Sequence, residues 1–509
     1  MGSNRRFRSS RRFFGALVVA LLAVGGALPV RASGGVVTDC SNDSQLNSLI
    51  ATGGTISFNC GAGAHTIPVS GQKSINADTT IDGGGTITLD AQNQFRIFDV
   101  GATLTLRGLV LTRAFFNGDG GAIRNTSNGT LILESSTIRN SHATLSGGAI
   151  LSLGPLTIRD SLLEGNTALN GGALYPRFAG ASTTIVNSVL RNNKATDSTD
   201  GWGGAILAWD GAPVTIDGGE LAGNTANEGG GIYNFANSVL AIKNGTQLRE
   251  NITDKWGAIY NDGTATITDA TFSGNKSFYC GGGIFNFQAG VATVTDATFD
   301  GNFSSEGGGI CNSGGTLTLA NTTFSNNSVD FTGGGLYNVS GTSTITNVTF
   351  SGNSAVDSGG GVYQTAGGTT ALTNVTLSGN SAPRGGGIFR DNRYTGTVTV
   401  KNSIVTNSPQ GGNCAGTIIS SGYNLATDNT CGFTQVANVR LGPLANNGGP
   451  TRTFLPMPGS PAIDFVITGC PPPTTDQRGA PRPVGSLCDA GAVEFGASLP
   501  MLFVPLARK

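Results

Sequence analysis

The sequence has few charged residues and little that could form helices. Charged residues make up 12% of its 509 residues, 80 residues are glycine, and only 2 are histidine. Glycine is unfavourable inside helices, and the apolar residues do not recur with the helical period of 3.6. Long helices are therefore not expected. The two histidines, His65 and His142, lie far apart in sequence, and we expect neither a cofactor nor a metal site built on histidine.

Long apolar runs are absent beyond the N-terminus. Residues 1–32 combine an arginine-rich start, an apolar run from Ala16 to Leu28 and a small final residue, Ala32, as a secretory signal peptide does. We predict cleavage after Ala32, while a partial twin-arginine string leaves the export route open. No later run reaches the roughly 18 residues of a membrane-spanning helix. The mature chain is expected at the cell surface or outside the cell, without a transmembrane helix.

The charge balance argues against a nucleic-acid partner. Six of the 30 basic residues and none of the 31 acidic residues lie in residues 1–32, so the remaining chain has a net charge of −7. A chain that binds nucleic acid would need a basic surface. All eight cysteines also lie beyond residue 32, and an oxidising compartment would join them.

One unit of about 26 residues repeats along most of the chain. Its marker is the aliphatic residue after each glycine pair: Ile123, Ile150, Leu174, Ile206, Ile232, Ile259, Ile284, Ile310, Leu336, Val362 and Ile388. Each unit contains short extended pieces with apolar residues at every second position. Units stacked as successive turns bury a continuous apolar column. The repeat predicts an all-β fold, a single right-handed parallel β-helix with three strands per turn from about Thr103 to Val405.

Asparagine recurs in three columns of the repeat. The first contains Asn125, Asn234, Asn261, Asn286, Asn312 and Asn338. The second contains Asp160, Asn187, Asp269, Asp296, Asn321, Asn347, Asn374 and Asn402. The third contains Asn166, Asn193, Asn224, Asn275, Asn302, Asn327, Asn353 and Asn380. Amides in register can bond along the stack, and asparagine also tolerates left-handed turns. We predict a buried ladder of Asn321, Asn347 and Asn374.

The repeat units carry a family resemblance. In units such as "GGGLYNVSGTSTITNVTFSGN", residues 33–410 resemble the pectin-lyase-like right-handed β-helices and the polymorphic outer-membrane protein repeats of bacterial surface proteins. "CSNDSQLNSLIATGGTISFNC" resembles the capping helix and first strand of such folds, with Leu46, Leu49 and Ile50 buried. A cap is expected because an open end exposes apolar side chains and unpaired strand edges.

The C-terminal part carries a second resemblance. "LGPLANNGGPTRTFLPMPGSPAID", "TDQRGAPRP" and "CDAGAVEF" resemble the choice-of-anchor Q domain of bacterial surface proteins, which implies an irregular C-terminal cap. Asp476, Arg478 and Arg482 there could bind an anion, but an ion pair that closes the cap is the favoured interpretation. The expected domains are the signal peptide (1–32), the N-terminal cap and first turns (33–102), the repeats (103–402), the anchor-like region (403–495) and the tail (496–509).

The cysteine positions predict three disulfides. Close spacing pairs Cys40 with Cys60, Cys414 with Cys431, and Cys470 with Cys488. Cys280 precedes the marker Ile284 by four residues, whereas Cys311 follows the marker Ile310 by one. A five-residue offset in extended chain spans about 16 Å, beyond the roughly 7 Å limit between bonded Cα atoms. We therefore expect Cys280 and Cys311 to be unbonded.

No known catalytic motif stands out. Glycosidases need two facing carboxyls, and the Asn-Thr-Asp, Asp-Asp and His-Gly strings of polygalacturonases are absent. The irregular 32-residue turn is an alternative saccharide or Ca²⁺ site, with the candidate residues Asp197, Asp200, Trp202, Trp209 and Asp210, and with Asp217, Glu220 and Glu228 nearby. A solvated insertion without a site is the favoured interpretation of this turn.

Aromatic residues follow many of the markers, at the outward position: Tyr175, Tyr233, Tyr260, Phe285, Tyr337, Tyr363 and Phe389. Adjacent rings would stack about 4.8 Å apart. They could stiffen one sheet under a covering loop, or form an exposed track for a glycan or a partner surface. We expect a non-catalytic, monomeric surface protein that acts in adhesion, as a stalk or in polysaccharide binding. The alternative is a polysaccharide lyase or glycoside hydrolase with an atypical site near residues 195–230.

Overall fold

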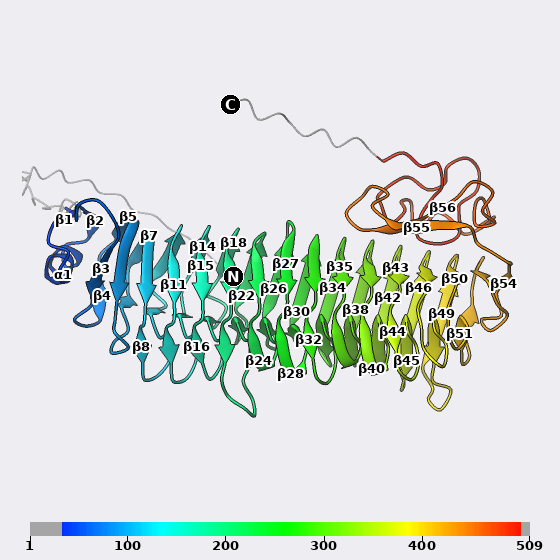
Figure 1. The fold of residues 1–509 in the computed structure, drawn as a ribbon, viewed down its shortest axis with the longest axis horizontal. Coiled ribbons are helices and arrows are strands. Elements are labelled where there is room, and N and C mark those ends of the chain that lie inside the picture. Colours follow the sequence, from blue (N-terminus) through cyan, green and yellow to red (C-terminus); the bar gives the residue numbers. More distant parts are fainter. Residues whose placement is uncertain (1–32, 500–509) are drawn as a thin grey trace, which may run out of the picture.

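The computed structural model describes residues 33–499, and the predicted signal peptide lies outside them. The chain forms one long parallel β-solenoid with a short helix at one end (Figure 1). Helix α1 (Ser44–Ile50) covers the first turn with Leu46 and Ile50 buried and Leu49 partly buried, as the cap resemblance implied. Within residues 33–499, no helix is long and apolar enough to span a membrane.

Three sheets run along the solenoid. Sheet B, with 14 strands, has one strand per turn: β4 (Lys73–Ile75), β6 (Phe98–Val100), β9 (Ile123–Asn125), β13 (Ile150–Ser152), β17 (Leu174–Pro176), β21 (Ile206–Ala208), β25 (Ile232–Asn234), β29 (Ile259–Asn261), β33 (Ile284–Phe287), β37 (Ile310–Ser313), β41 (Leu336–Val339), β45 (Val362–Thr365), β48 (Ile388–Arg390) and β51 (Cys414–Ala415). Sheet C, with 10 strands, comprises β8 (Phe115–Phe116), β12 (His142–Ala143), β16 (Thr167–Ala168), β20 (Lys194–Ala195), β24 (Thr225–Glu228), β28 (Ile252–Trp256), β32 (Lys276–Ser277), β36 (Phe303–Glu306), β40 (Ser328–Thr332) and β44 (Ser354–Ala355).

Sheet A contains 30 strands, because in most turns a two-residue bend, whose first residue has a positive φ, divides its strand in two. Its members are β1 (Gly35–Val37), β2 (Gly54–Phe58), β3 (His65–Pro68), β5 (Thr79–Asp90), β7 (Thr103–Thr112), β10 (Thr130–Glu134), β11 (Thr137–Arg139), β14 (Leu156–Arg159), β15 (Leu162–Glu164), β18 (Thr183–Val186), β19 (Val189–Arg191), β22 (Pro213–Asp217), β23 (Glu220–Ala222), β26 (Val239–Lys243), β27 (Thr246–Arg249), β30 (Thr264–Thr268), β31 (Ala270–Ser273), β34 (Val291–Thr295), β35 (Thr298–Asp300), β38 (Thr316–Ala320), β39 (Thr323–Ser325), β42 (Thr342–Thr346), β43 (Thr349–Ser351), β46 (Thr369–Thr373), β47 (Thr376–Ser378), β49 (Thr397–Lys401), β50 (Ile404–Thr406), β52 (Ile419–Ser420), β53 (Leu425–Ala426) and β54 (Thr434–Gln435). The three strands expected per turn thus correspond to three sheets.

The interior of the solenoid is a continuous apolar column. All eleven marker aliphatics are completely buried, which confirms the predicted parallel β-helix. Beside them, the rings of Phe272, Phe299, Phe324 and Phe350 stack 4.5–4.8 Å apart. The glycine run makes room for these rings, since a Cβ on Gly335 would lie 2.8 Å from the Phe350 ring. The repeat therefore encodes both the inward residues and the space they need.

Two of the three asparagine columns are hydrogen-bonded ladders. In the third column each side-chain amide donates to the next carbonyl oxygen, from Asn166 through Asn251 to Asn380, over 2.8–3.0 Å. In the first column the same chain of bonds runs from Asn234 to Asn338 and ends on Gln364. Their side chains are buried, so the ladders satisfy amides that the core would otherwise leave unpaired.

The second asparagine column is not a ladder, and that prediction is wrong. Asn321, Asn347 and Asn374 have φ angles of 50°, 54° and 52°, at the bend within sheet A. The only amide bond along the column there is a long one, 3.5 Å from Asn347 Nδ2 to Asn321 Oδ1. Neither side-chain polar atom of Asn374 has a partner among the described residues. These residues are used for their left-handed backbone, which asparagine tolerates.

Strand pairing continues beyond the expected boundary at residue 403, to β54. The chain then turns back, and residues 437–499 (the return segment) lie along sheet A beside the last turns (Figure 1). The segment contains one antiparallel pair, β55 (Leu441–Ala445) and β56 (Thr453–Pro456). Gln477 donates to Thr323 Oγ1 over 2.9 Å and accepts from Thr349 Oγ1 over 2.6 Å. The C-terminal cap is therefore fixed to the side of the solenoid by threonine hydroxyls.

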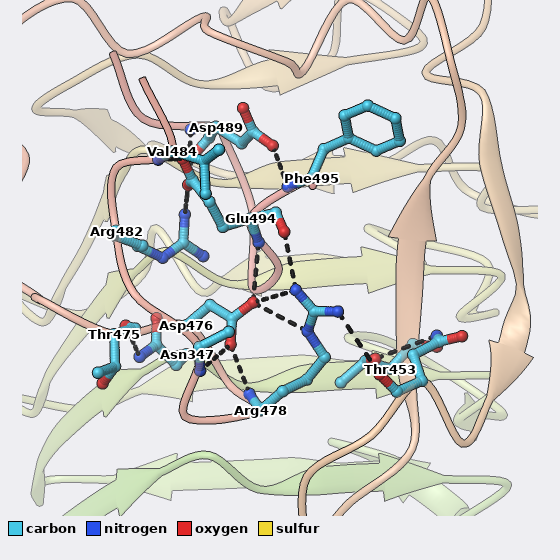
Figure 2. A network of polar contacts seen from close by, with 12 residues as sticks. Asn347, Thr453, Thr475, Asp476, Arg478, Arg482, Val484, Asp489, Glu494 and Phe495 are labelled. Carbon is cyan, nitrogen blue, oxygen red and sulfur yellow. Dashed lines mark hydrogen bonds and ion pairs between the residues drawn. The ribbon is translucent and has the colours of Figure 1, made fainter. Parts of the chain in front are cut away.

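A buried ionic network holds the return segment together (Figure 2). Asp476 accepts two hydrogen bonds from the Arg478 guanidinium, of 2.9 and 2.7 Å. Arg482 pairs with Glu494 over 3.0 Å, and the side chains of both are at most 1% exposed. Asp489 accepts from the backbone of Asp464 and Phe495. Because these groups bond to one another and to backbone, the structural interpretation of Asp476, Arg478 and Arg482 accounts for all three residues.

All eight cysteines are bonded. The predicted pairs Cys40–Cys60, Cys414–Cys431 and Cys470–Cys488 are present. Cys280 and Cys311 are also joined, with Cα atoms 5.8 Å apart, so the prediction that they are unbonded is wrong. The 16 Å estimate assumed extended chain, but Gly281 has a φ of 75° and turns the chain sharply after Cys280. Four disulfides indicate a protein that folds in an oxidising, extracellular type of compartment.

Candidate functional site

The predicted aromatic residues form one column on the outer face of sheet B, which we call the ring column. Its strands pair in register, so that Tyr233 lies beside Tyr260, and Tyr260 beside Phe285. The Tyr233 and Tyr260 rings are 4.3 Å apart and 5° from parallel, and the Tyr363 and Phe389 rings are 5.1 Å apart. The expected stacking is therefore present in two runs of three rings, and Leu207 interrupts the column before the first run and Cys311 between the two.

The ring column is mostly covered. Tyr175, Tyr233, Tyr260, Phe285 and Tyr363 are 4–8% exposed, whereas Tyr337 and Phe389 are half-buried. This burial raises the pKa of the Tyr175 and Tyr363 hydroxyls to about 12. The covering side chains that pack against the column are Trp202, Trp209, Phe235, Trp256 and Phe287. The ring column itself therefore does not form an exposed aromatic track.

A second column borders the first and supplies part of the cover. One residue per turn stands immediately before the glycine run, and successive ones pair across the turns: Trp202, Glu228, Trp256, Cys280, Glu306, Thr332, Ser358 and Arg384. We call this the glycine-edge column. It lies where sheet C ends and the glycine run leads into sheet B, and it carries aromatic, acidic, polar and basic side chains at different turns.

All three tryptophans of the chain lie on this face and are half-buried. Trp202 stacks on Trp209 with ring centroids 5.3 Å apart, and Trp209 stacks on Phe235 at 3.7 Å. Trp256 stacks on Phe285 at 5.3 Å. Stacking fixes the indole rings while part of each remains open to solvent. We call Trp202, Trp209 and Trp256 the tryptophan face.

A carboxyl pair adjoins the tryptophan face. Lys255 Nζ lies 3.3 Å from Glu228 Oε1 and 3.9 Å from Asp200 Oδ1. Burial raises the pKa of Glu228, although Lys255 opposes the rise. Asp200 is exposed. The two carboxyls thus differ in environment while sharing one lysine, which is an arrangement that acid–base chemistry on a saccharide could use.

The other candidates of the irregular turn are separated by the fold. Asp197 accepts hydrogen bonds from Thr199 and from the backbone of Asp200, and these bonds lower its pKa and shape the loop. Asp210 pairs with Arg177 over 3.3 Å. Asp217 and Glu220 lie on sheet A in ion pairs with Lys243 and Arg249. Of the predicted loop site, Trp202 therefore lies beside Glu228, Asp200 shares Lys255 with Glu228, and Trp209 stacks on Trp202.

Sequence reasoning did not single out Trp256, Lys255 or Glu306. Each lies at or just before the glycine-edge column, and Glu306 has a pKa raised by burial. A signal was available in the sequence, because the residue before the glycine run can be aligned as easily as the aliphatic after it. Among residues 33–499, no group of three or more histidine, cysteine, aspartate or glutamate side chains could hold a metal ion.

Comparisons with known proteins agree with the fold. Residues 258–431 match a family described as a right handed beta helix region. Among solved structures, the catalytic unit of the thermostable GH87 alpha-1,3-glucanase from Streptomyces thermodiastaticus strain HF3-3 is similar with a TM-score of 0.45 and 15% identity, over 75% of this chain and 67% of that one. The curated proteins give no match. The chain is thus similar to right-handed β-helix proteins in fold.

Proposed function

We propose that this chain is a non-catalytic exported protein, at the cell surface or secreted, that binds a polysaccharide on the tryptophan face. The observation that carries the proposal is that all three tryptophans lie half-buried on one face of the solenoid, against the ring column, and are supported by stacked rings. Rigid aromatic surfaces gain apolar contact at little entropic cost, and polar neighbours such as Asp200 and Lys255 supply orientation.

The proposal also includes how the chain is exported and how it is held at a surface. Repeats like those of polymorphic outer-membrane proteins and an anchor-like region over residues 403–495 suit a stalk or adhesin held at a surface. The expected cleavage after Ala32 and the division at residues 102, 402 and 495 are part of this proposal. So is a monomeric state. The four disulfides support an extracellular location.

The test is a glycan array on residues 33–509, followed by titration of the best neutral oligosaccharide. Trp256→Ala should weaken binding by about tenfold or more, because one stacking surface is lost. Phe331→Ala is the control, since Phe331 is also an aromatic residue that solvent reaches but lies in β40, three turns along the solenoid from Trp256 and outside the tryptophan face. Equal binding by both variants, or no binding on the array, would contradict the proposal.

A second candidate function is hydrolysis of the bound glycan. It is favoured by Glu228, whose pKa is raised by burial as a general acid requires, beside the carboxylate of Asp200. Release of reducing sugar from the bound glycan, abolished in Glu228→Gln, would replace the non-catalytic assignment. Binding without release would retain it.

A further inference from the structure

A hollow lined by three arginines lies at the C-terminal end of the glycine-edge column. It has a volume of about 370 Å³, and its walls are Arg384, Phe389, Arg390, Asp391, Asn392, Arg393 and Gly416. Arg384 follows Trp256 by five turns along the column, about 24 Å at the spacing of adjacent strands. The hollow therefore borders the same column as Trp256 but is separate from the tryptophan face.

The hollow has an excess of positive charge. Arg384 Nη2 binds both carboxylate oxygens of Asp357 at 2.6 Å, and Arg393 forks onto Asp391. This pairing holds the pKa of Asp391 at about 2, so its charge is constant in ordinary buffers. Arg390 has no carboxylate partner among the described residues. Three guanidinium groups thus face two carboxylates.

Arg390 is held in place by neutral acceptors. Its guanidinium donates to the carbonyl oxygens of Gly396 and Tyr394 and to Asn392 Oδ1, over 2.8, 2.6 and 2.7 Å. These bonds fix the position of the group without neutralising its charge. A guanidinium that is fixed, charged and open to a hollow is suited to an oxyanion, which it can bind through its remaining N–H groups.

An aromatic wall completes the hollow. The half-buried Phe389 ring stacks on Tyr363 at 5.1 Å, and the Arg384 guanidinium lies 5.3 Å from the Phe389 centroid. A ligand here would meet an apolar ring on one side and guanidinium groups on the other. A sugar ring that carries an oxyanion presents these two features together.

We propose that this hollow binds an oxyanion group, a sulfate ester or a carboxylate, carried by a saccharide. The proposal rests on the proposed function for the saccharide part, while the anion part stands on the three arginines. Arg384 and Arg393 contact the oxyanion through N–H groups that their carboxylate partners leave free, and Arg390 supplies the unpaired positive charge. Binding weakens as salt rises, because the contact is between charges at a surface.

The test compares neutral, sulfated and carboxylated forms of one oligosaccharide, together with inorganic sulfate, by calorimetric titration at low salt. Arg384→Gln with Asp357→Asn removes the outer guanidinium without leaving a free carboxylate. We expect the double variant to lose at least about tenfold in affinity for a charged form and nothing for the neutral form. Arg191→Gln with Glu164→Gln, an exposed pair on sheet A, is the matched control.

The outcomes separate the two proposals. Tighter binding of the sulfated or of the carboxylated form, sensitive to Arg384 and not to Arg191, supports the oxyanion site and identifies its source. Binding of sulfate alone, with the same sensitivity, supports the site while contradicting the saccharide function. Equal affinity for charged and neutral forms, with dependence on Trp256, overturns the oxyanion site and retains the function. No effect of the Arg384 variant on any ligand overturns the site.

Discussion

Asparagine serves two physical purposes at the residue scale, although its columns look alike in sequence. In the ladder columns the side chain matters: Asn327 donates to Asn353 Oδ1 and to the Phe299 carbonyl, and its own Oδ1 accepts from Asn302. At the bend in sheet A the backbone matters, as for Asn374 with its φ of 52°. The repeat predicted all three columns but not which property each one uses, because register alone does not give the backbone angle.

This difference predicts opposite outcomes for two buried asparagines. Asn327→Leu should lower the free energy of unfolding by about 1–3 kcal/mol or more, because it leaves ladder amides and a carbonyl unpaired in the core. Asn374→Gly should be nearly neutral, since glycine adopts the left-handed backbone freely and removes an amide without partners. Urea unfolding of both variants measures this. A larger loss for Asn374→Gly than for Asn327→Leu would refute the distinction.

At the scale of elements, the turns were predictable and the return segment was not. Each turn contacts its neighbours about 26 residues away, so period and alternation predict strands, markers and the inward face. The return segment bonds to distant partners, as Gln477 does to Thr349 and Thr323 over separations of 128 and 154 residues, and no repeat records such contacts. The Cys280–Cys311 disulfide was also not predictable from the repeat, because the turn at Gly281 brings the two Cα atoms within bonding distance. The sequence predicted only part of the tryptophan face. It indicated Trp202 and Trp209, which share one irregular turn, but not Trp256, which lies in another turn.

The raised pKa of Asp489 predicts that the stability of the return segment depends on pH. Burial raises its pKa in the fold to about 6, above the ordinary value of 3.8, so the folded chain holds the proton more tightly than the unfolded chain does. The stability that this group contributes is therefore full below about pH 4 and is lost as the pH rises through 6. Between pH 4.5 and 7 the loss should be on the order of 2 kcal/mol.

Asp489→Asn isolates this contribution, because other buried acids such as Glu228 and Glu306 also have raised pKa values and remain in the variant. Urea unfolding of the chain and of the variant at pH 4.5, 5.5 and 7 gives the two slopes. We expect a shallower fall of stability with pH in Asp489→Asn. Parallel slopes would show that Asp489 ionises as readily in the fold as in the unfolded chain.

At the scale of the whole molecule, the solenoid is nearly one-dimensional, so the return segment should stabilise only the turns that it touches. Its contacts include the outer side chains of β39, β43, β47 and β50, among them Thr323, Thr349, Thr376 and Ile404, and an ion pair of Arg452 with Asp300 at the end of β35. A chain ending at Val436 keeps every strand of the three sheets and removes Cys470 and Cys488 together. Amide hydrogen exchange should then quicken in β39, β43, β47 and β50, because Thr323, Thr349 and Thr376 lose hydrogen-bond partners and Ile404 loses its apolar cover. Strands β11 and β15 should keep their protection and act as the control within the same sample. Faster exchange along the whole rod would mean that the solenoid unfolds as one unit, and unchanged exchange in β43 would mean that the segment only rests on the sheet.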